Sequence, residues 1–345
     1  KNFKFVDENK KMLIGKSNPN SDSFDFLVYT IENGETVAIP SSIKYLGPSS
    51  FSGINYINKI IFSEDSECVS FLDYALSRLD IKELYIPSKV KKINKGNFSF
   101  VKNLSNIKLS SQNPYFKLLN NKILLSKSDS NSEVFDVIEF VCSDVSEFKI
   151  PSFIKYFKPY ALLNVKDLTI PQNIEALHEF DFYDTLENIK FEPGSKIQKI
   201  NALCFSRCNK IKSIEFPDDS NLKIIEHLAF CYKLQKLILP PSLEILEDKW
   251  HQNFSAFVSI SPKSKNLKYL DDDHKLIAMK SDIKKNTFDV LCYANPDIKY
   301  AFIPSFIKKI QSFTFYNCTS LRKIDFDRNS ELISIGSEAF NGSLI

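Results

Sequence analysis

The hexapeptide IPSFIK occurs at 150–155 and again at 303–308, and the related IPSSIK stands at 39–44. In each copy Ile comes directly before Pro, which lacks a backbone donor and fixes φ, so each phrase predicts a strand that ends at a turn. Three copies of one strand-and-turn phrase indicate that this chain of 345 residues is built from repeats.

The repeat continues between these copies. The last apolar residue before each turn recurs mostly every 20 to 25 residues, and an apolar frame of the type L-x-x-L-x-L, such as Leu104, Ile107 and Leu109, precedes most of these positions. The final alternation has the period of a strand with one buried face. The predicted strands end at Ile39, Phe62, Ile86, Leu109, Ile150, Ile170, Phe191, Phe216, Leu239, Ile260, Ile303 and Phe326.

Two kinds of return path follow these strands. One begins with Pro and reaches a large apolar residue 11 positions later, as from Pro40 to Phe51, whereas the other follows a strand ending in Phe and is 14 residues long. The phrases HLAF at 227–230 and SEAF at 337–340 predict a short helical turn with Ala and Phe packed inward. The longer returns share a serine whose hydroxyl we expect to bond turn backbone, namely Ser66, Ser195, Ser220 and Ser330.

Two intervals, 109–150 and 260–303, are longer than the rest and hold extra segments that align with each other and with the N-terminus. Each contains a Phe-Asp phrase, namely FDFLVY from 24, FDVIEF from 135 and FDVLCY from 288. Apolar runs on either side of a polar turn predict an inserted β-hairpin. These three segments, here called the hairpin islands, span 1–30, 112–142 and 264–295.

The IP-x-x-(I/V)-x-x-(I/L) phrase, the segments FSRCNKI at 205–211 and FYNCTSL at 315–321, and the islands together resemble BspA-like leucine-rich repeat proteins over the whole chain. The resemblance implies a curved leucine-rich solenoid used for protein recognition. Such proteins occur on surfaces of mucosal bacteria and protozoan parasites, where they have been linked to adhesion to host cells or to matrix proteins such as fibronectin. The repeat itself transfers no binding residues.

The expected fold is therefore an α/β repeat, a single leucine-rich-repeat solenoid over 1–345 with about twelve parallel strands on its concave face and three inserted β-hairpins. One repeat cannot bury its own apolar face, so the repeats must stack. The chain begins near the start of an island and stops in mid-repeat, without an initiating Met or atypical capping repeats, so we expect a fragment of a longer protein.

Composition excludes several function classes. With 45 basic and 42 acidic residues the chain has no field strong enough to imply a nucleic acid or acidic membrane partner. No apolar run reaches the roughly 18 residues needed to cross a bilayer. Seven Cys at low density argue against a disulfide framework and leave the compartment open.

No catalytic, cofactor or metal site emerges from the motifs. The four His, at 178, 227, 251 and 274, lack metal-ligand spacing. Cys204 and Cys208 could share a metal, but Cys208 matches Cys318 in the repeat, which favours buried inert thiols. The acidic run 271–273 could bind calcium, yet it occupies the hairpin turn, which favours a solvated turn. We therefore expect a protein that is not an enzyme.

The strand face opposite the core is the predicted partner-binding surface. One residue per strand forms its central column, in which several apolar side chains are not required by the core. Packing among neighbours on the same face is the structural alternative. The predicted partner-binding residues are Ile61, Tyr85, Lys108, Lys149, Lys190, Ile238 and Phe302, and the candidate N-glycosylation sites are Asn97, Asn103, Asn253, Asn317 and Asn341.

The sequence thus predicts a binding module whose role is adhesin-type recognition of a host matrix or cell-surface protein, located at the cell surface or secreted. An intracellular, cytoplasmic scaffold of the same fold is the alternative. Nucleic-acid binding through Lys108, Lys149 and Lys190 is disfavoured, because three lysines in a chain with a net charge of +3 provide little phosphate affinity.

Overall fold

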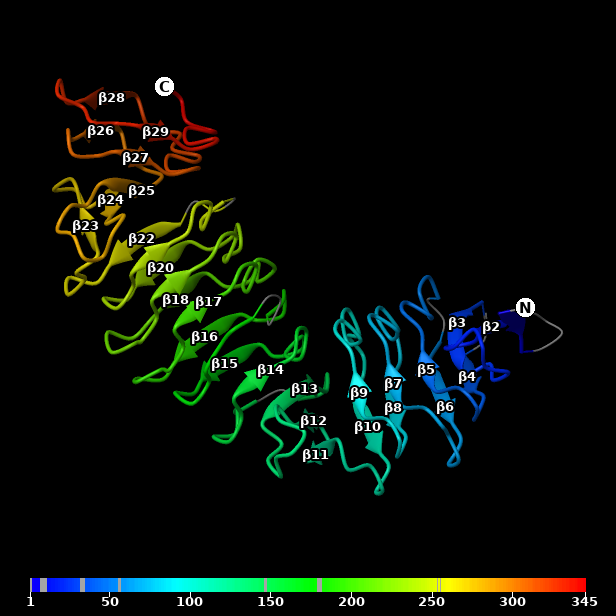
Figure 1. The fold of residues 1–345 in the computed structure, drawn as a ribbon. Helices are drawn as coiled ribbons and strands as arrows, with labels where there is room; N and C mark the ends of the chain where they lie inside the picture. Colours follow the sequence, from blue (N-terminus) through cyan, green and yellow to red (C-terminus); the bar gives the residue numbers. More distant parts are fainter. Residues whose placement is uncertain are drawn as a thin grey trace. The chain divides into compact units, whose positions relative to one another are not determined.

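The computed structural model describes residues 2–6, 11–31, 35–54, 57–145, 148–178, 182–252, 254 and 256–345. These residues form 29 short strands in eight sheets, joined by turns, and none of them is helical. The chain divides into two compact units (Figure 1). Unit 1 comprises Lys1–Phe148 and Phe153–Val165, and unit 2 comprises Lys149–Ser152 and Lys166–Ile345.

The first ladder of unit 1, here called its front ladder, contains the predicted repeat strands. They are parallel and lie side by side in Figure 1 in the order β10-β8-β6-β4. Their side chains alternate as predicted, so that Val37 and Ile39 are buried while Thr36 and Ala38 are exposed. The strands are β4 (Thr36–Ile39), β6 (Lys59–Phe62), β8 (Glu83–Ile86) and β10 (Asn106–Leu109).

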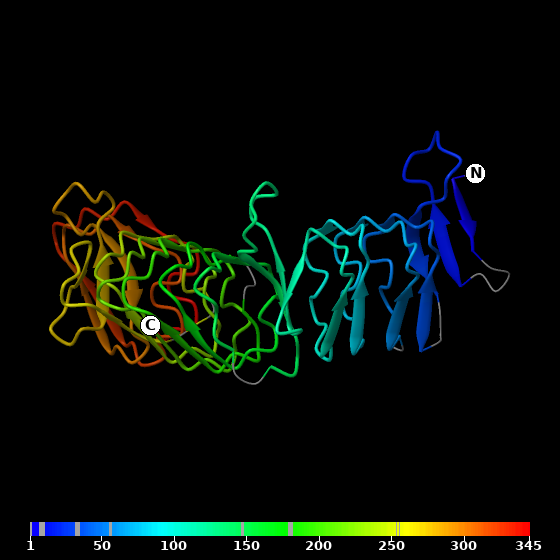
Figure 2. The same ribbon diagram turned by 90° about the horizontal axis from the view of Figure 1, so that it is seen from below.

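A second ladder of two-residue strands runs along the return paths of the same coils, which stack side by side in Figure 2. This rear ladder continues the first island, so one sheet has the order β1-β2-β3-β5-β7-β9. Buried Leu, Ile and Phe side chains form the core of these coils. The strands are β1 (Phe3–Phe5), β2 (Met12–Gly15), β3 (Phe26–Thr30), β5 (Tyr45–Leu46), β7 (Ser70–Phe71) and β9 (Lys92–Ile93).

The antiparallel pairing predicted for the islands is confirmed, and each island has a third strand. In the second island, β11 (Lys117–Leu119), β12 (Ile123–Ser126) and β13 (Val137–Val141) are antiparallel neighbours. The third strand then pairs in parallel with β14 (Tyr156–Phe157) of the next coil. An island therefore enters the rear ladder, and the strand that follows it resumes the repeat.

Unit 2 repeats this plan. Its front strands form the sheets β15-β16, β18-β20-β22 and β26-β28, and its rear strands form β17-β19-β21 and the ladder beside the third island, β23-β24-β25-β27-β29. The bounds are β15 (Asp167–Ile170), β16 (Asn188–Phe191), β17 (Lys199–Ile200), β18 (Ser213–Glu215), β19 (Ile224–Ile225), β20 (Lys236–Leu239), β21 (Ile245–Leu246), β22 (Phe257–Ile260), β23 (Leu267–Tyr269), β24 (Leu276–Met279), β25 (Val290–Ala294), β26 (Tyr300–Ile303), β27 (Lys309–Ile310), β28 (Lys323–Phe326) and β29 (Ser334–Ile335).

The α/β class and the short helical turns predicted at 227–230 and 337–340 are wrong, because the described returns contain turns in place of helix. The physical reason is a left-handed residue two positions before the inward-packed residue, which reverses the chain where a right-handed helix would continue. Leu228 has φ of 54° and Glu338 has φ of 53°. The same place is left-handed at Ser49, Tyr74, Gly96, Tyr160, Leu203, Lys249 and Phe313.

The serine prediction is confirmed in all four longer returns. Each hydroxyl accepts a hydrogen bond from the backbone N–H two residues later, at 3.2 to 3.4 Å. Inward aromatic residues stack from coil to coil behind these turns, with ring centroids 4.8 Å apart for Phe182 and Phe205 and 5.9 Å apart for Phe205 and Phe230. The repeats are thus held by ladder bonds, turn bonds and an aromatic column.

Trp250, His251 and Phe254 form an aromatic cluster with the third island. The Trp250 and Tyr293 rings lie 5.5 Å apart, and His251 lies between them and Phe254 in edge-to-face contacts. The Tyr293 hydroxyl donates to the carbonyl of Ala256 at 2.6 Å. Large aromatic side chains and one hydrogen bond thus join this return path to the third island.

Candidate protein-binding face

The outward side chains of the front ladders form the predicted binding face. In unit 1 the strand register places Ala38 opposite Ile61 and Tyr85 opposite Lys108. Lys59 pairs with Glu83, which brings β6 and β8 into the same register two residues before Ile61. Ile61 is 41% exposed, although one-sided burial of the sheet does not require an apolar side chain there.

Charged groups lie beside Ile61 and Tyr85 on this ladder. Lys108 Nζ lies 2.8 Å from Glu83 Oε2, and Asn106 donates its side-chain amide to the same oxygen at 2.8 Å. The hydrogen bond from Lys108 is the main cause that lowers the pKa of Glu83. Lys108 is therefore partly neutralised by its neighbour. Ile61 offers exposed apolar contact area on this ladder, whereas Tyr85 is half-buried and packs partly against the core.

A second exposed cluster lies in unit 2 on β26 and β28. Tyr300 is 50% exposed and Phe302 is 44% exposed, two residues apart on the outward side of one strand. The Tyr300 hydroxyl donates to Asp325 at 3.1 Å, and Lys323 pairs with the same carboxylate at 2.6 Å. Tyr300 is not among the predicted residues, although the period of two that selects Phe302 also places Tyr300 on this face.

The remaining predicted residues lie in separate places. Lys190 is exposed and pairs with Thr169 between β16 and β15. Ile238 is half-buried between Glu215 and Ser259 in the β18-β20-β22 sheet. Lys149 is exposed but lies outside the strands of the described chain. Within each sheet, the strands thus pair in the register that the predicted column requires. The predicted residues are divided among separate sheets.

The predicted glycosylation sites differ in accessibility. Asn97 is 1% exposed, and its side-chain amide bonds the backbone of Leu76, Leu72 and Asn94, so the folded chain does not present it for modification. Three candidates are exposed, namely Asn103, Asn317 and Asn341. Asn253 lies outside the described residues.

The groups considered for chemistry have structural positions. All seven cysteines are buried and free, and burial raises the pKa of the Cys208 thiol well above its ordinary value. Asp271 accepts backbone bonds from Lys275 and Leu276, which closes the turn of the third island. Across the described ranges, no group of three or more His, Cys, Asp or Glu side chains could hold a metal ion.

Within the described chain, no helix has the length and apolar character needed to span a membrane. Parallel coils with an L-x-x-L-x-L frame, stacked through a front and a rear ladder, define a β-solenoid of the leucine-rich-repeat class. The sequence matches the family described as "BspA type Leucine rich repeat region" in six copies over 25–122, 154–273 and 281–345. The chain belongs to this family.

A solved structure supports the same fold, and a second is reported beside it. A leucine-rich cell surface protein from Faecalibacterium prausnitzii aligns with a TM-score of 0.52 at 18% identity, over 87% of this chain and 63% of that protein. The pneumococcal vaccine antigen PcpA aligns with a TM-score of 0.49 at 18% identity, over 86% of this chain and 69% of the antigen. The chain thus spans less than two thirds of the first of these proteins. A comparison with curated protein sequences finds no match.

Proposed function

We propose that this chain is a protein-binding module that acts at the cell surface in adhesion to host or matrix proteins. The observation that carries the proposal is the apolar area that the front ladders expose, at Ile61 in unit 1 and at Tyr300 and Phe302 in unit 2. Exposed aromatic and aliphatic groups on a rigid sheet are typical of the anchors that dominate protein interfaces.

Family membership and the solved structures support the cellular context of this proposal. The family consists of leucine-rich repeats, whose stacked sheets provide extended binding surfaces, and the F. prausnitzii protein is named a cell surface protein. The fold alone does not define a partner, so the partner class is argued from the exposed side chains. The exposed Asn103, Asn317 and Asn341 would be candidate glycan sites in a secreted protein.

The predicted lysines of each unit would contribute mainly to association rate and specificity. Lys108 already pairs with Glu83, whereas Lys190 and Lys149 have no ion pair with the described residues. Rim charges of this kind steer encounter with an acidic partner and add little to the final affinity. We therefore expect binding that falls only moderately as salt is raised.

The proposal is tested by binding to a panel of matrix proteins and intact epithelial cells. The first variant carries Ile61→Ser, Tyr85→Ser and Lys108→Gln, and the second carries Tyr300→Ser and Phe302→Ser. A control variant carries Phe153→Ser and Tyr232→Ser, which are 44% and 58% exposed but lie outside the described strands. Saturable binding that falls at least tenfold in either face variant, but not in the control, would support the proposal. Equal binding by all variants would contradict it.

A further inference from the structure

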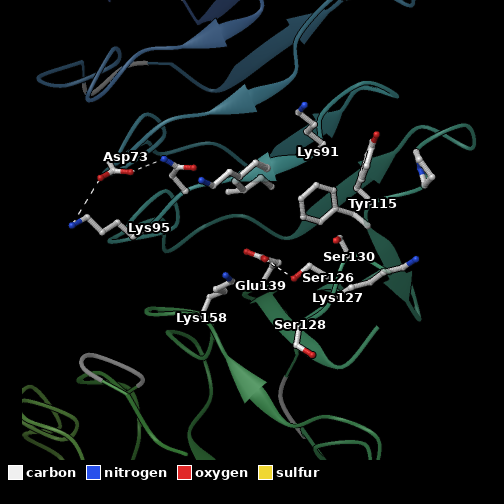
Figure 3. A pocket seen from close by; sticks show the side chains of 15 residues that line it. Asp73, Lys91, Lys95, Tyr115, Ser126, Lys127, Ser128, Ser130, Glu139 and Lys158 are labelled. Carbon is white, nitrogen blue, oxygen red and sulfur yellow. Dashed lines mark hydrogen bonds and ion pairs between the residues drawn. The ribbon is translucent and has the colours of Figure 1, made fainter. Parts of the chain in front are cut away.

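Unit 1 contains an open cavity of about 710 Å³ between β9 and the second island (Figure 3). Its walls come from the end of β9, the segment before β11, the end of β12, and the bulged part of β13. A volume of this size lies within the range of sites that hold small molecules. The residues that line the cavity include Lys91, Lys92, Tyr115, Ser126, Lys127, Glu139 and Lys158.

The first observation is the position of Glu139. The pairing of β12 with β13 shifts register between Leu124 and Leu125, which leaves Glu139 as the extra residue of a β-bulge. Bulges redirect a side chain relative to the regular pleat and are common beside functional sites. Glu139 is 5% exposed, and in Figure 3 its carboxyl group points into the cavity.

The second observation is that the island does not need a carboxyl group there. The other two islands have the same bulge, and the equivalent residues are Val28 and Cys292. The Ser126 hydroxyl donates to Glu139 at 2.6 Å, whereas the residues equivalent to Ser126 are Gly15 and Met279. The fold thus accepts apolar pairs at this point, and a buried carboxyl group is unfavourable in itself.

The third observation concerns the gap between each later island and the coil before it, which a side chain bridges beside the third island and which is open beside the second island. Beside the third island, Gln311 donates its side-chain amide to the carbonyl of Leu246 at 2.9 Å, which bridges the gap between β21 and the island's coil. Lys158 occupies the position equivalent to Gln311, directly after the two-residue strand. It makes no such bridge to Ile93, the counterpart of Leu246, within the described chain. The corresponding gap stays open.

The fourth observation is the charge of the cavity wall. Of its five lysines, Lys95 lies 3.9 Å from Asp73, which also accepts a bond from Asn94. The other four, Lys91, Lys92, Lys127 and Lys158, have no carboxylate within ion-pair distance among the described residues. Burial raises the pKa of Glu139, with opposing contributions from Lys158 and Ser126. The wall is therefore an excess of cations around one buried hydrogen-bonding carboxyl group.

We propose that this cavity binds an acidic saccharide. Its carboxylate or sulfate would pair with Lys158 and the neighbouring lysines, a hydroxyl would exchange hydrogen bonds with Glu139 and Ser126, and the ring would pack beside Tyr115, which is 45% exposed. A simple anion has no hydroxyl for the buried carboxyl group, and a neutral sugar has no charge for the lysines. A ligand that carries both groups matches the wall, whether it is a free oligosaccharide or a glycan on a glycoprotein.

The test is titration calorimetry with a sulfated uronate tetrasaccharide and with sialyllactose, beside neutral lactose and a hexaglutamate peptide. The variants are Glu139→Val and Lys158→Gln, which install the residues of the first and third islands, and the control is Lys82→Gln at an exposed lysine outside the cavity. We expect an acidic saccharide to bind, at least tenfold more weakly to Glu139→Val and at least fivefold more weakly to Lys158→Gln, with the control unchanged and lactose silent.

Folding and source are controlled separately. Glu139→Val should raise Tm because it removes a buried carboxyl group, so weaker binding by this variant would not reflect unfolding. A glycoprotein ligand that loses binding after enzymatic removal of its acidic sugars would identify the attached glycan as a source. The proposal would be overturned if no acidic saccharide bound, or if both cavity variants bound it with the affinity of the unchanged protein. It would also be overturned if hexaglutamate bound as tightly as the acidic saccharide. The variants of the outward face should keep saccharide affinity, so this test is independent of the protein-binding proposal.

Discussion

Asp289 accepts two hydrogen bonds from Ser281, at 2.9 Å from its backbone N–H and at 2.8 Å from its hydroxyl. Asp136 and Asp25 make the same pair of bonds with Ser128 and Ser17, also eight residues earlier. The backbone carbonyl of Asp289 also accepts from Lys308 of the next coil at 2.8 Å. The Asp of the repeated Phe-Asp phrase therefore closes each island through its side chain and joins the third island to the following repeat through its backbone carbonyl.

Loss of the Asp289 side chain should destabilise unit 2. We expect Asp289→Ala to reduce the free energy of unfolding by about 1 to 3 kcal/mol, because Ser281 loses its partner for two bonds next to buried strands. Urea titration followed by circular dichroism measures the change. Asp272→Ala, in the exposed turn of the same island, is the control and should change stability by less than about 0.5 kcal/mol. Equal effects would show that the bonds are dispensable.

His251 should make unit 2 sensitive to acid. It is fully buried, neither ring nitrogen has a hydrogen-bond partner among the described residues, and burial lowers its pKa to about 3. In the unfolded chain the imidazole of His251 binds a proton near pH 6.5, whereas in the folded chain it stays neutral until the pH is much lower. The contribution of neutral His251 to the free energy of unfolding is therefore fully present above pH 6.5 and is lost as pH falls toward 3. The slope approaches about 1.4 kcal/mol per pH unit.

The measurement for His251 is urea unfolding at several pH values between 7.5 and 4.5. In His251→Phe the free energy of unfolding should change less with pH than in the unchanged protein. His227→Gln, at an exposed histidine, should keep the original dependence on pH. An unchanged slope in His251→Phe would mean that other groups cause the acid sensitivity.

The thiols should be unreactive in the folded protein. Burial raises the pKa of Cys68 and of Cys318 to about 12, and of Cys142 to about 11, so the reactive thiolate is scarce at pH 8. A colorimetric disulfide reagent should therefore label the native chain slowly and all seven cysteines at once in guanidinium chloride. Rapid labelling of one native thiol would contradict the buried placement.

The left-handed residue two positions before each inward residue should tolerate substitution by Gly better than substitution by a β-branched residue. Lys249 is exposed and has φ of 64°, a conformation that Gly adopts without strain and that β-branched residues avoid. Lys249→Gly should be neutral or stabilising, and Lys249→Val should cost roughly 1 to 2 kcal/mol. Thermal unfolding of the two variants compares them directly, and greater stability of the Val variant would refute the turn assignment.

The sequence predicted the front ladder well because its signal is local. The period of two, the Pro stops and the Ser turns each act within a few residues, and they placed the outward column in the register that pairs Ala38 with Ile61 and Thr169 with Lys190. The helical turns failed because HLAF has a helix-like composition while Leu228 adopts positive φ, at a place that is left-handed in several other returns. Local propensity contains no such information.

The cavity was not predictable from the column analysis. It depends on a bulge that redirects Glu139 and on Lys158, which is 19 residues away, and neither belongs to the outward face. A signal did exist in the island alignment, where Glu stands in FDVIEF against Val and Cys in the other islands. Aligned repeats thus indicate a site most clearly where one copy departs from the others.

The central claim, recognition of a protein by the outward face, is tested most directly by hydroxyl-radical footprinting of the chain with and without a bound partner. We expect that oxidation of Tyr85, or of Tyr300 and Phe302, falls severalfold in the complex, while that of the exposed Tyr232 and Phe153 stays unchanged. Protection confined to the islands or to Tyr232 and Phe153, with Tyr85, Tyr300 and Phe302 oxidised as in the free chain, would contradict the claim.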